Sequence, residues 1–323
     1  EREFKKIIEN EKTSFSRYYF FFANYLFNNG KKKEATSFIN LANKEYPGNL
    51  LINQFRKKLN HEEKFNNEFD CKNSAHIMGE ILYIFANGLS SQGDYKLSNF
   101  YISLSKFLNS DFLSYNTLLA ENLTILKRND DAKESYKQIS KIGSVFKWYS
   151  AKKITELMEL EGDKDSIKYL SKVYSEINPG VYDTFDFANF LRAEEEYDKS
   201  INLYSELLIK INRNHKLYPK ILERRGMAYE RSDKWDLAEK DLLMSLNVLP
   251  KEPYVMNYLA YSWVEKNENI EDALKMLKEA NNLKKHDGYI TDSLGWALYK
   301  LKNFSEAKKY LEKAIILMPR DPI

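Results

Sequence analysis

The sequence predicts an all-α protein built as a solenoid of stacked helix–turn–helix repeats. Apolar residues recur at helical spacing along nearly the whole chain, and small residues return at a fixed distance from one repeat to the next. Only 11 glycines and 7 prolines occur in 323 residues, too few for the many turns of a β-rich fold. A helical repeat array accounts for these observations, because each repeat buries its apolar face only against its neighbours.

The clearest repeat is Gly288–Arg320, which is predicted to form two amphipathic helices joined by a short polar turn. Gly295, Ala307 and Ala314 lie where the two helix backbones must approach closely. Pro319 ends the second helix, because it has no backbone N–H and clashes with the preceding turn. Counted from the start of the repeat, these four residues occupy places 8, 20, 27 and 32, which defines a register for the rest of the chain.

The N-terminal part of the chain is predicted to hold one full repeat followed by an irregular stretch. Within residues 1–47 we expect a capping helix over Glu1–Ser14 and then a repeat that starts at Ser16. From that start the register is filled by Ala23, Ala35, Ala42 and Pro47. Residues 48–78 depart from the register, with one apolar helix pattern followed by the polar His61–Asn67. We expect an irregular helical connector or hinge there.

Residues 79–323 return to the register and are predicted to form a repeat array. Its units start near residues 79, 113, 144, 181, 219, 253 and 288, and the unit near 144 is degenerate. The unit from Val181 runs 38 residues to Pro219, which predicts a lengthened exit loop at Ile211–Leu217. Ala273 comes one place late, which predicts an extra residue in the turn at Glu268–Ile270.

The register closely resembles the tetratricopeptide repeat, a helix–turn–helix unit of about 34 residues. The resemblance covers nearly the whole chain and rests on the small positions together with Leu294, Tyr299 and Leu311. It implies a right-handed superhelix with a concave face. The C-terminal half, with its runs NYLAYSW and DGYITDSLGWALY, is similar to exported bacterial tetratricopeptide proteins of alphaproteobacterial type. That family continues with a further repeat where this chain ends, so we expect a truncated chain or a disordered tail.

Charge and hydropathy argue against several classes of protein. Lys and Arg number 50 against 47 Asp and Glu, a formal net charge of +3, and the charges are interspersed. Because no basic stripe stands out, nucleic acid is not an expected partner. No apolar run reaches the roughly 18 residues of a membrane-spanning helix. The lone Cys71 allows no internal disulfide, and it is either a buried small apolar residue or a free thiol.

The compartment stays open at this point. The chain begins with Glu1 rather than Met, so we expect that a signal or lipidation segment has been removed or left out. A chain without disulfides fits the cytosol, and it fits equally a periplasmic helical protein that needs none. The family resemblance favours a periplasmic or outer-membrane-associated protein, with a cytoplasmic protein as the alternative.

The residues that carry chemistry do not gather into a catalytic or metal-binding pattern. The histidines His61, His76, His215 and His286 are scattered, and none pairs with a second ligand at metal-binding spacing. Glycine-rich phosphate loops and the common hydrolase motifs are missing from the sequence. We therefore expect no catalytic residues, no metal and no cofactor, and we predict that the chain is not an enzyme.

Candidate binding residues follow from the family resemblance, which puts places 2, 5, 6, 9, 12 and 13 of each first helix on the concave face. In the last two units this assigns to the groove Tyr254, Asn257, Tyr258, Tyr261, Tyr289, Asp292, Trp296 and Tyr299. Tyr and Trp offer a large contact area at low entropic cost together with a polar atom, which suits peptide recognition. Two interpretations stay open, because the same rings would also serve packing between repeats.

A second candidate patch consists of Asn189, Lys220 and Arg224. Chaperone-binding members of the family hold a terminal carboxylate with Lys at place 2 and Arg at place 6, and Lys220 and Arg224 match these places. The rest of that clamp is incomplete here. The alternatives are surface ion pairing with Glu223 and Glu194, or a bidentate grip of Arg224 on an acidic group.

The predicted function is a non-catalytic protein–protein interaction scaffold whose concave groove binds a segment of a partner protein. The resemblance favours an adaptor in the cell envelope, with an envelope protease or an assembly factor as partner. The alternative is a structural subunit of a stable multiprotein assembly that uses its convex faces and ends. Such a subunit should expose large apolar patches outside the groove.

Overall fold

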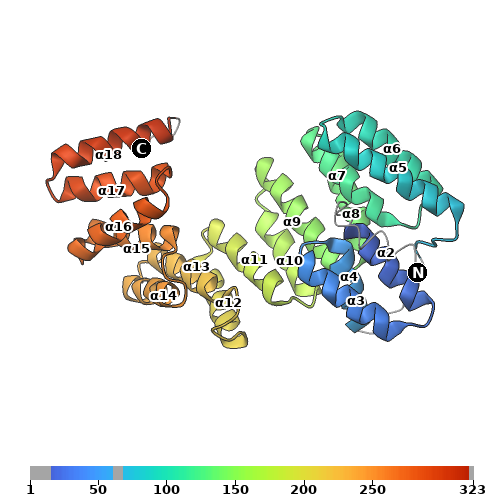
Figure 1. Cartoon of the computed structure of the whole chain (residues 1–323), viewed down its shortest axis with the longest axis horizontal. Coiled ribbons are helices and arrows are strands. Elements are labelled where there is room, and N and C mark those ends of the chain that lie inside the picture. Colours follow the sequence, from blue (N-terminus) through green and yellow to red (C-terminus); the bar gives the residue numbers. More distant parts are fainter. Residues whose placement is uncertain (1–15, 61–67, 320–323) are drawn as a thin grey trace. The chain divides into compact units, whose positions relative to one another are not determined.

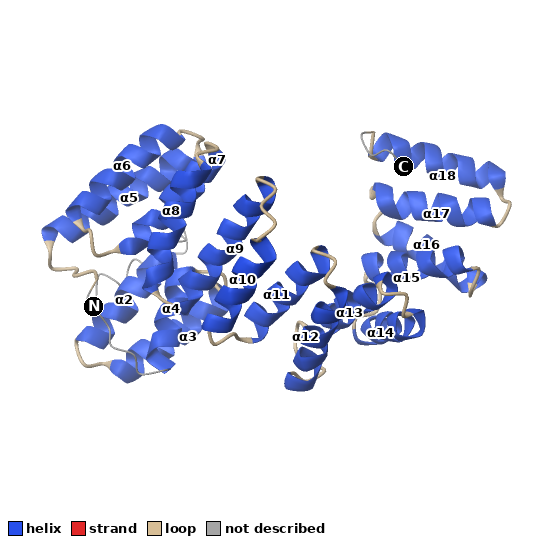
Figure 2. Ribbon diagram, turned by 180° about the vertical axis from the view of Figure 1, so that it is seen from behind, coloured by secondary structure: helices blue, strands red, loops and turns tan. Residues whose placement is uncertain are grey.

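The computed structural model describes residues 16–60 and 68–319, and within these ranges its regular elements are helices (Figures 1 and 2). The expected capping helix over Glu1–Ser14 and the polar stretch His61–Asn67 lie outside the described residues. The chain divides into two compact units, unit 1 (Glu1–Asn178) and unit 2 (Pro179–Ile323). No helix in the described ranges is both long enough and apolar enough to cross a membrane.

Unit 1 is a set of antiparallel helix pairs with one additional helix, α4. Its elements are α2 (Ser16–Asn28), α3 (Lys32–Glu45), α4 (Leu50–Asn60), α5 (Ser74–Ser91), α6 (Tyr95–Leu108), the 3-10 turn η1 (Leu113–Tyr115), α7 (Asn116–Ile125), α8 (Asn129–Ile139), the 3-10 turn η2 (Ser140–Ile142), α9 (Ser144–Leu160) and α10 (Ser166–Glu176). The helix expected within residues 48–78 is α4, which packs against α2, α3 and α9. The domain boundaries drawn from the sequence stay a prediction.

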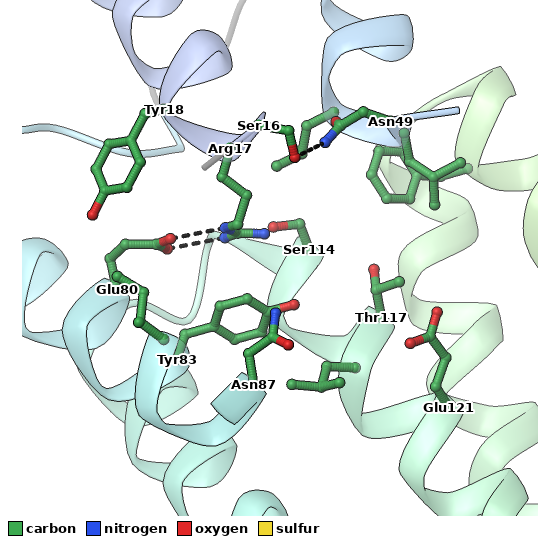
Figure 3. A pocket seen from close by; sticks show the side chains of 15 residues that line it. Ser16, Arg17, Tyr18, Asn49, Glu80, Tyr83, Asn87, Ser114, Thr117 and Glu121 are labelled. Atoms are coloured by element: carbon green, nitrogen blue, oxygen red, sulfur yellow. Dashed lines mark hydrogen bonds and ion pairs between the residues drawn. The ribbon is translucent and has the colours of Figure 1, made fainter. Parts of the chain in front are cut away.

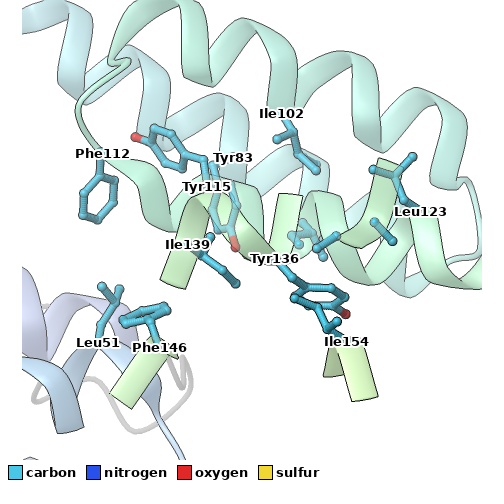
Figure 4. Packing of buried hydrophobic residues seen from close by; sticks show 14 of the residues in the cluster. Leu51, Tyr83, Ile102, Phe112, Tyr115, Leu123, Tyr136, Ile139, Phe146 and Ile154 are labelled. Atoms are coloured by element: carbon cyan, nitrogen blue, oxygen red, sulfur yellow. The ribbon is translucent and has the colours of Figure 1, made fainter. Parts of the chain in front are cut away.

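One buried cluster of unit 1 connects α2 and α4 with the elements from α5 to α9 (Figure 4). It brings together Phe21 of α2, Leu51 of α4, Tyr83 of α5, Tyr115 of η1 and Phe146 of α9. These side chains come from segments far apart in the sequence, so the first helix pair and α4 fold back onto the later pairs. Burial of such large rings is the main source of stability that a structure of this kind has.

Unit 2 alternates first and second helices of four consecutive pairs. Its helices are α11 (Val181–Ala193), α12 (Tyr197–Lys210), α13 (Tyr218–Arg231), α14 (Trp235–Val248), α15 (Pro253–Lys266), α16 (Ile270–Leu283), α17 (Gly288–Lys300) and α18 (Phe304–Leu317). Each odd-numbered helix packs against the helix that follows it, and α15 also packs against α17. The gap between α12 and α13 is the lengthened loop predicted at residues 211–217.

The small residues of the register lie where helices touch. A Cβ atom added to Gly295 would stand 2.8 Å from Cγ of Leu311 on α18, and one added to Gly226 would stand 3.0 Å from Cγ of Leu242 on α14. Ala307 and Ala314 are buried in the same interface as Gly295. The close approach predicted for Gly295 is therefore confirmed, since a larger side chain would push the two helices apart.

The turns inside the helix pairs share one backbone feature, a residue with positive φ. Glycine takes this conformation in the turns at Gly30, Gly93 and Gly162. In unit 2 the turn residues with positive φ are not glycine. The turn between α15 and α16 also explains why Ala273 comes one place late in the register. Asn267 and Asn269 both adopt positive φ, at 57° and 43°, so the turn between α15 and α16 holds the extra residue that the sequence predicted.

Candidate functional site

The aromatic residues predicted for the groove of unit 2 lie on two neighbouring first helices. Tyr254, Tyr258 and Tyr261 follow one another at helical spacing on α15, and Trp296 and Tyr299 do so on α17. Residues three and four apart lie on one side of a helix, and α15 packs beside α17. The structure therefore brings most of these side chains to one surface, the aromatic face, which also includes Tyr289 of α17.

Exposure divides the aromatic face into two groups. Tyr254, Tyr261, Tyr289 and Tyr299 are exposed, with 48%, 39%, 63% and 48% of their surface open to solvent. Tyr258 and Trp296 are only partly exposed, and both pack against the buried cluster around Leu259 and Leu294. The two interpretations of these rings thus apply to different residues, since the exposed tyrosines offer contact area and the other two rings support the core.

Carboxylates of neighbouring elements orient the rings. The Tyr254 hydroxyl donates to Asp287 Oδ2 at 3.0 Å, and the Tyr258 hydroxyl donates to Glu230 Oε2 at 2.7 Å. Burial, with the charge and hydrogen bond of Glu230, raises the pKa of Tyr258 above its usual value. Such hydrogen bonds fix the rings in place before any ligand binds, which lowers the entropic cost of binding.

The indole of Trp296 is held in the same way. Its Nε1 donates to the carboxylate of Glu265, and its ring stacks on Tyr299 with 5.5 Å between centroids. The ammonium of Lys300 lies 5.1 Å from the Trp296 ring centre, within reach of a cation–π contact. This part of the face is therefore a rigid, stacked arrangement.

The two polar residues predicted for the same face are partly buried. Asn257 and Asp292 lie beside the rings on α15 and α17. Within the described part of the chain, Oδ1 of Asn257 is buried and accepts no hydrogen bond. Burial, followed by the charges of Glu265 and Asp292, raises the pKa of Tyr261. The face therefore combines exposed phenol groups with acceptor atoms.

The second predicted patch lies on α11 and α13. Asn189 accepts a hydrogen bond from the Tyr204 hydroxyl at 2.7 Å, and Lys220 is exposed. The guanidinium of Arg224 is 3.7 Å from Oε1 of Glu223, so the ion pair with Glu223 forms. Burial raises the pKa of Glu223, although the charge of Arg224 works in the opposite direction. An acidic group of a partner that binds Arg224 would therefore have to compete with Glu223 for the guanidinium.

A cavity that the sequence did not predict lies in unit 1 and has a volume of about 330 Å³ (Figure 3). Its lining comes from the starts of α2 and α4, from α5, from η1 with α7, and from α9. The described residues that line it include Arg17, Glu80, Tyr83, Asn87, Ser114, Thr117 and Glu121. Counted from Gly79 and Leu113, the last six occupy places 2, 5 and 9 of their units. The register that located the aromatic face therefore contained the signal for this cavity as well.

One stretch of the chain matches a known family. The profile of the family described as tetratricopeptide repeat matches residues 292–321, which hold most of α17 and all of α18. These residues match a tetratricopeptide repeat. The helix pairs of both units have this architecture, so the predicted fold class, an α-solenoid of tetratricopeptide repeats, is confirmed.

Two curated relatives match part of this chain. A TPR repeat-containing protein of Pseudomonas aeruginosa is 28% identical over 107 residues, which is 32% of this chain and 18% of that protein. The human cell division cycle protein 16 homolog is 27% identical over 104 residues, 30% of this chain and 17% of that protein. The matched stretch thus spans less than a fifth of the length of either relative.

Solved structures with a related arrangement of helices include MamA from Desulfovibrio magneticus RS-1 and the APC/C hetero-tetramer Cut9–Hcn1. MamA is 15% identical with a TM-score of 0.43, over 55% of this chain and 98% of that one. The Cut9–Hcn1 structure is 16% identical with a TM-score of 0.49, over 92% of this chain and 58% of that one. At these values neither structure bears on the function of this chain.

Tetratricopeptide-repeat proteins are generally non-catalytic scaffolds. Here two of the histidines, His76 and His215, take part in local contacts. Nδ1 of His76 accepts from the backbone N–H of Asp70 at 3.0 Å, and Nδ1 of His215 accepts from that of Leu217 at 3.2 Å. Over the described ranges, no group of three or more His, Cys, Asp or Glu side chains is arranged to hold a metal ion. Cys71 is half-buried and is a free thiol.

Proposed function

We propose that this chain is a non-catalytic scaffold that binds an extended segment of a partner protein on the aromatic face of unit 2. The observation that carries the proposal is the group of exposed tyrosines, Tyr254, Tyr261, Tyr289 and Tyr299, on adjacent first helices. Exposed rings of this size are costly to leave in water, and tyrosine is enriched at protein–protein contacts. Carboxylate hydrogen bonds hold at least part of this surface in a fixed arrangement.

The aromatic face and the patch of Asn189, Lys220 and Arg224 belong to one repeat array, so we propose that they serve the same partner. The rings supply apolar contact area, and Lys220 adds an exposed positive charge. The more specific proposal, an adaptor for an envelope protease or an assembly factor, rests on the similarity of the C-terminal runs to exported tetratricopeptide proteins.

The test is affinity capture from the native lysate with wild type and a Tyr261→Ser/Tyr289→Ser variant, read by mass spectrometry. Both rings are exposed, so the variant should stay folded, which circular dichroism checks. Ile209→Ser on α12 is the matched control, because Ile209 is exposed and lies outside the predicted groove positions. The proposal requires a protein that wild type and Ile209→Ser capture and the tyrosine variant loses. Equal capture by all three would refute it.

A second candidate function has an observation of its own, an apolar surface on α5 and α6 outside the groove positions. The exposed residues there are Ile77, Met78, Ile81, Phe85, Leu97, Phe100 and Phe107. We propose as the alternative that this surface makes the chain a structural subunit of a stable assembly. Sedimentation of the native complex tests it, because Phe85→Ser/Phe100→Ser should release the chain. Release by the tyrosine variant instead would favour the aromatic face.

A further inference from the structure

The cavity of unit 1 has polar atoms that the folded chain leaves without partners. Ser114 is 3% exposed, and its hydroxyl forms no hydrogen bond with any described residue, nor does the buried hydroxyl of Thr117. Both residues line the cavity, and Figure 3 shows Thr117, Glu121 and Asn87 around the same open space. Buried polar groups are normally hydrogen-bonded, so an orphaned pair beside a cavity indicates a site for a ligand or for water.

The charges around the cavity do not cancel. Arg17 forms an ion pair with Glu80, and these two charges compensate one another. Glu121 accepts a hydrogen bond from the Tyr149 hydroxyl at 2.7 Å, and no described Lys or Arg forms an ion pair with it. The remaining charge of the lining is therefore negative. Among the described residues that line the cavity, an anionic ligand would find no free cation, because the guanidinium of Arg17 is already paired with Glu80.

One part of the cavity wall already binds a cation, the guanidinium of Arg17. The guanidinium of Arg17 donates to both carboxylate oxygens of Glu80, at 2.8 and 2.9 Å, and it lies 4.3 Å above the ring of Tyr83. Glu80 and Tyr83 are at places 2 and 5 of the unit that starts at Gly79. The neighbouring unit presents hydroxyls at these places, Ser114 and Thr117, and adds the carboxylate of Glu121 at place 9. This second half of the wall offers acceptors, and no Lys or Arg of residues 16–60 or 68–319 forms an ion pair with it.

We propose that the cavity binds the basic side chain, lysine or arginine, of a partner protein. Glu121 supplies the opposite charge, and Asn87, Thr117 and Ser114 supply acceptor oxygens for the N–H groups, which basic side chains have in excess. A volume of about 330 Å³ is at the small end of ligand pockets, which suits one side chain better than a cofactor. This site belongs to unit 1, so it is independent of the aromatic face of unit 2.

The test uses short fluorescent peptides of alanine and serine that differ only in the central residue, which is arginine, lysine, citrulline or glutamate. Citrulline keeps the shape of arginine without its charge. We expect the arginine or the lysine peptide to bind full-length protein roughly tenfold more tightly than the citrulline peptide, by fluorescence anisotropy. This preference should shrink as salt is added, because Glu121 is exposed to solvent.

The decisive variant is Glu121→Gln, which removes the charge and keeps an acceptor for Tyr149. It should abolish the preference for basic peptides, and Asn87→Ala should weaken it. Glu134→Gln on α8 is the matched control, since it makes the same charge change at an exposed residue that does not line the cavity. Equal affinity for the arginine, lysine and citrulline peptides, a preference for glutamate, or no binding at millimolar peptide would each overturn the inference. So would an unchanged preference in Glu121→Gln. None of these results would affect partner capture through the tyrosines.

Discussion

Arg17 of α2 and Glu80 of α5 are 63 residues apart in the chain, and their side chains form a bidentate ion pair. Only 18% of the Arg17 side chain and 7% of the Glu80 side chain are exposed. Burial is the largest single cause and lowers the pKa of Arg17, but the charge and hydrogen bond of Glu80 together with Tyr83 and Tyr115 outweigh it, so the pKa lies above its ordinary value. The pair therefore ties the first helix pair to the later repeats of unit 1.

Arg17→Met should destabilise the protein by about 3–5 kcal/mol, because it leaves the buried carboxylate of Glu80 without its counter-charge. Arg17→Met/Glu80→Leu should lose less than either single change, since no buried charge is then left unpaired. Urea denaturation of the three variants measures this. Glu206→Ala is the control, because its pair with Lys210 is exposed and should be worth about 0.3–0.5 kcal/mol. A loss for Arg17→Met as small as that of the control would contradict a structural role.

Two glycines in helices should respond to alanine in opposite directions. Gly295→Ala should destabilise by about 1–3 kcal/mol, because the new Cβ would stand 2.8 Å from Cγ of Leu311 and 3.1 Å from its backbone N. Gly88→Ala on α5 meets no atom within 4 Å, so its higher helix propensity should stabilise by about 0.5–1 kcal/mol. Thermal unfolding of both variants decides the point. Stabilisation of both variants would mean that helix propensity alone governs these sites.

The rings of the aromatic face should differ in their effect on stability. Tyr258→Ala should cost about 1–3 kcal/mol, because it removes a partly buried ring and its hydrogen bond to Glu230. Tyr289→Ala should stay within about 0.5 kcal/mol of wild type, since the ring is 63% exposed. Chemical denaturation measures both values. Equal losses would mean that Tyr289 also supports the core, and it would then be unsuitable for the binding test.

Glu223 should make stability fall as the pH rises. Burial raises its pKa in the folded protein above the usual value of 4.5, so the folded state binds more protons than the unfolded state between these two values. The stability of wild type relative to Glu223→Gln should therefore be highest below pH 4.5 and should decline as the pH rises through the folded pKa. Denaturation midpoints across this range provide the measurement. A difference that grows with pH would show that Arg224 dominates over burial.

The location of the candidate sites could be predicted only in part. The register placed the tyrosines of α15 and α17 on adjacent helices, because helical spacing alone decides which residues share a face. It did not separate exposed Tyr289 from half-buried Tyr258, since exposure depends on what the neighbouring helices cover. The same register could have identified Glu80 and Thr117 as groove residues, because the units that start at Gly79 and Leu113 keep the repeat spacing.

The sequence by itself determined the helix pairs and their close-contact residues such as Gly295 and Ala307. These depend on side-chain size and backbone freedom over a few residues, so local spacing is enough to reveal them. Only the tertiary structure decided that Arg17 meets Glu80 and that a cavity forms beside them. The stretch between α3 and α5 does not follow the repeat register, so the register cannot predict how α2 packs against α5. The ion pair between Arg17 and Glu80, which are 63 residues apart, depends on that packing. Only the folded structure shows that Glu121 lines this cavity and that it has no ion-pair partner among the described residues.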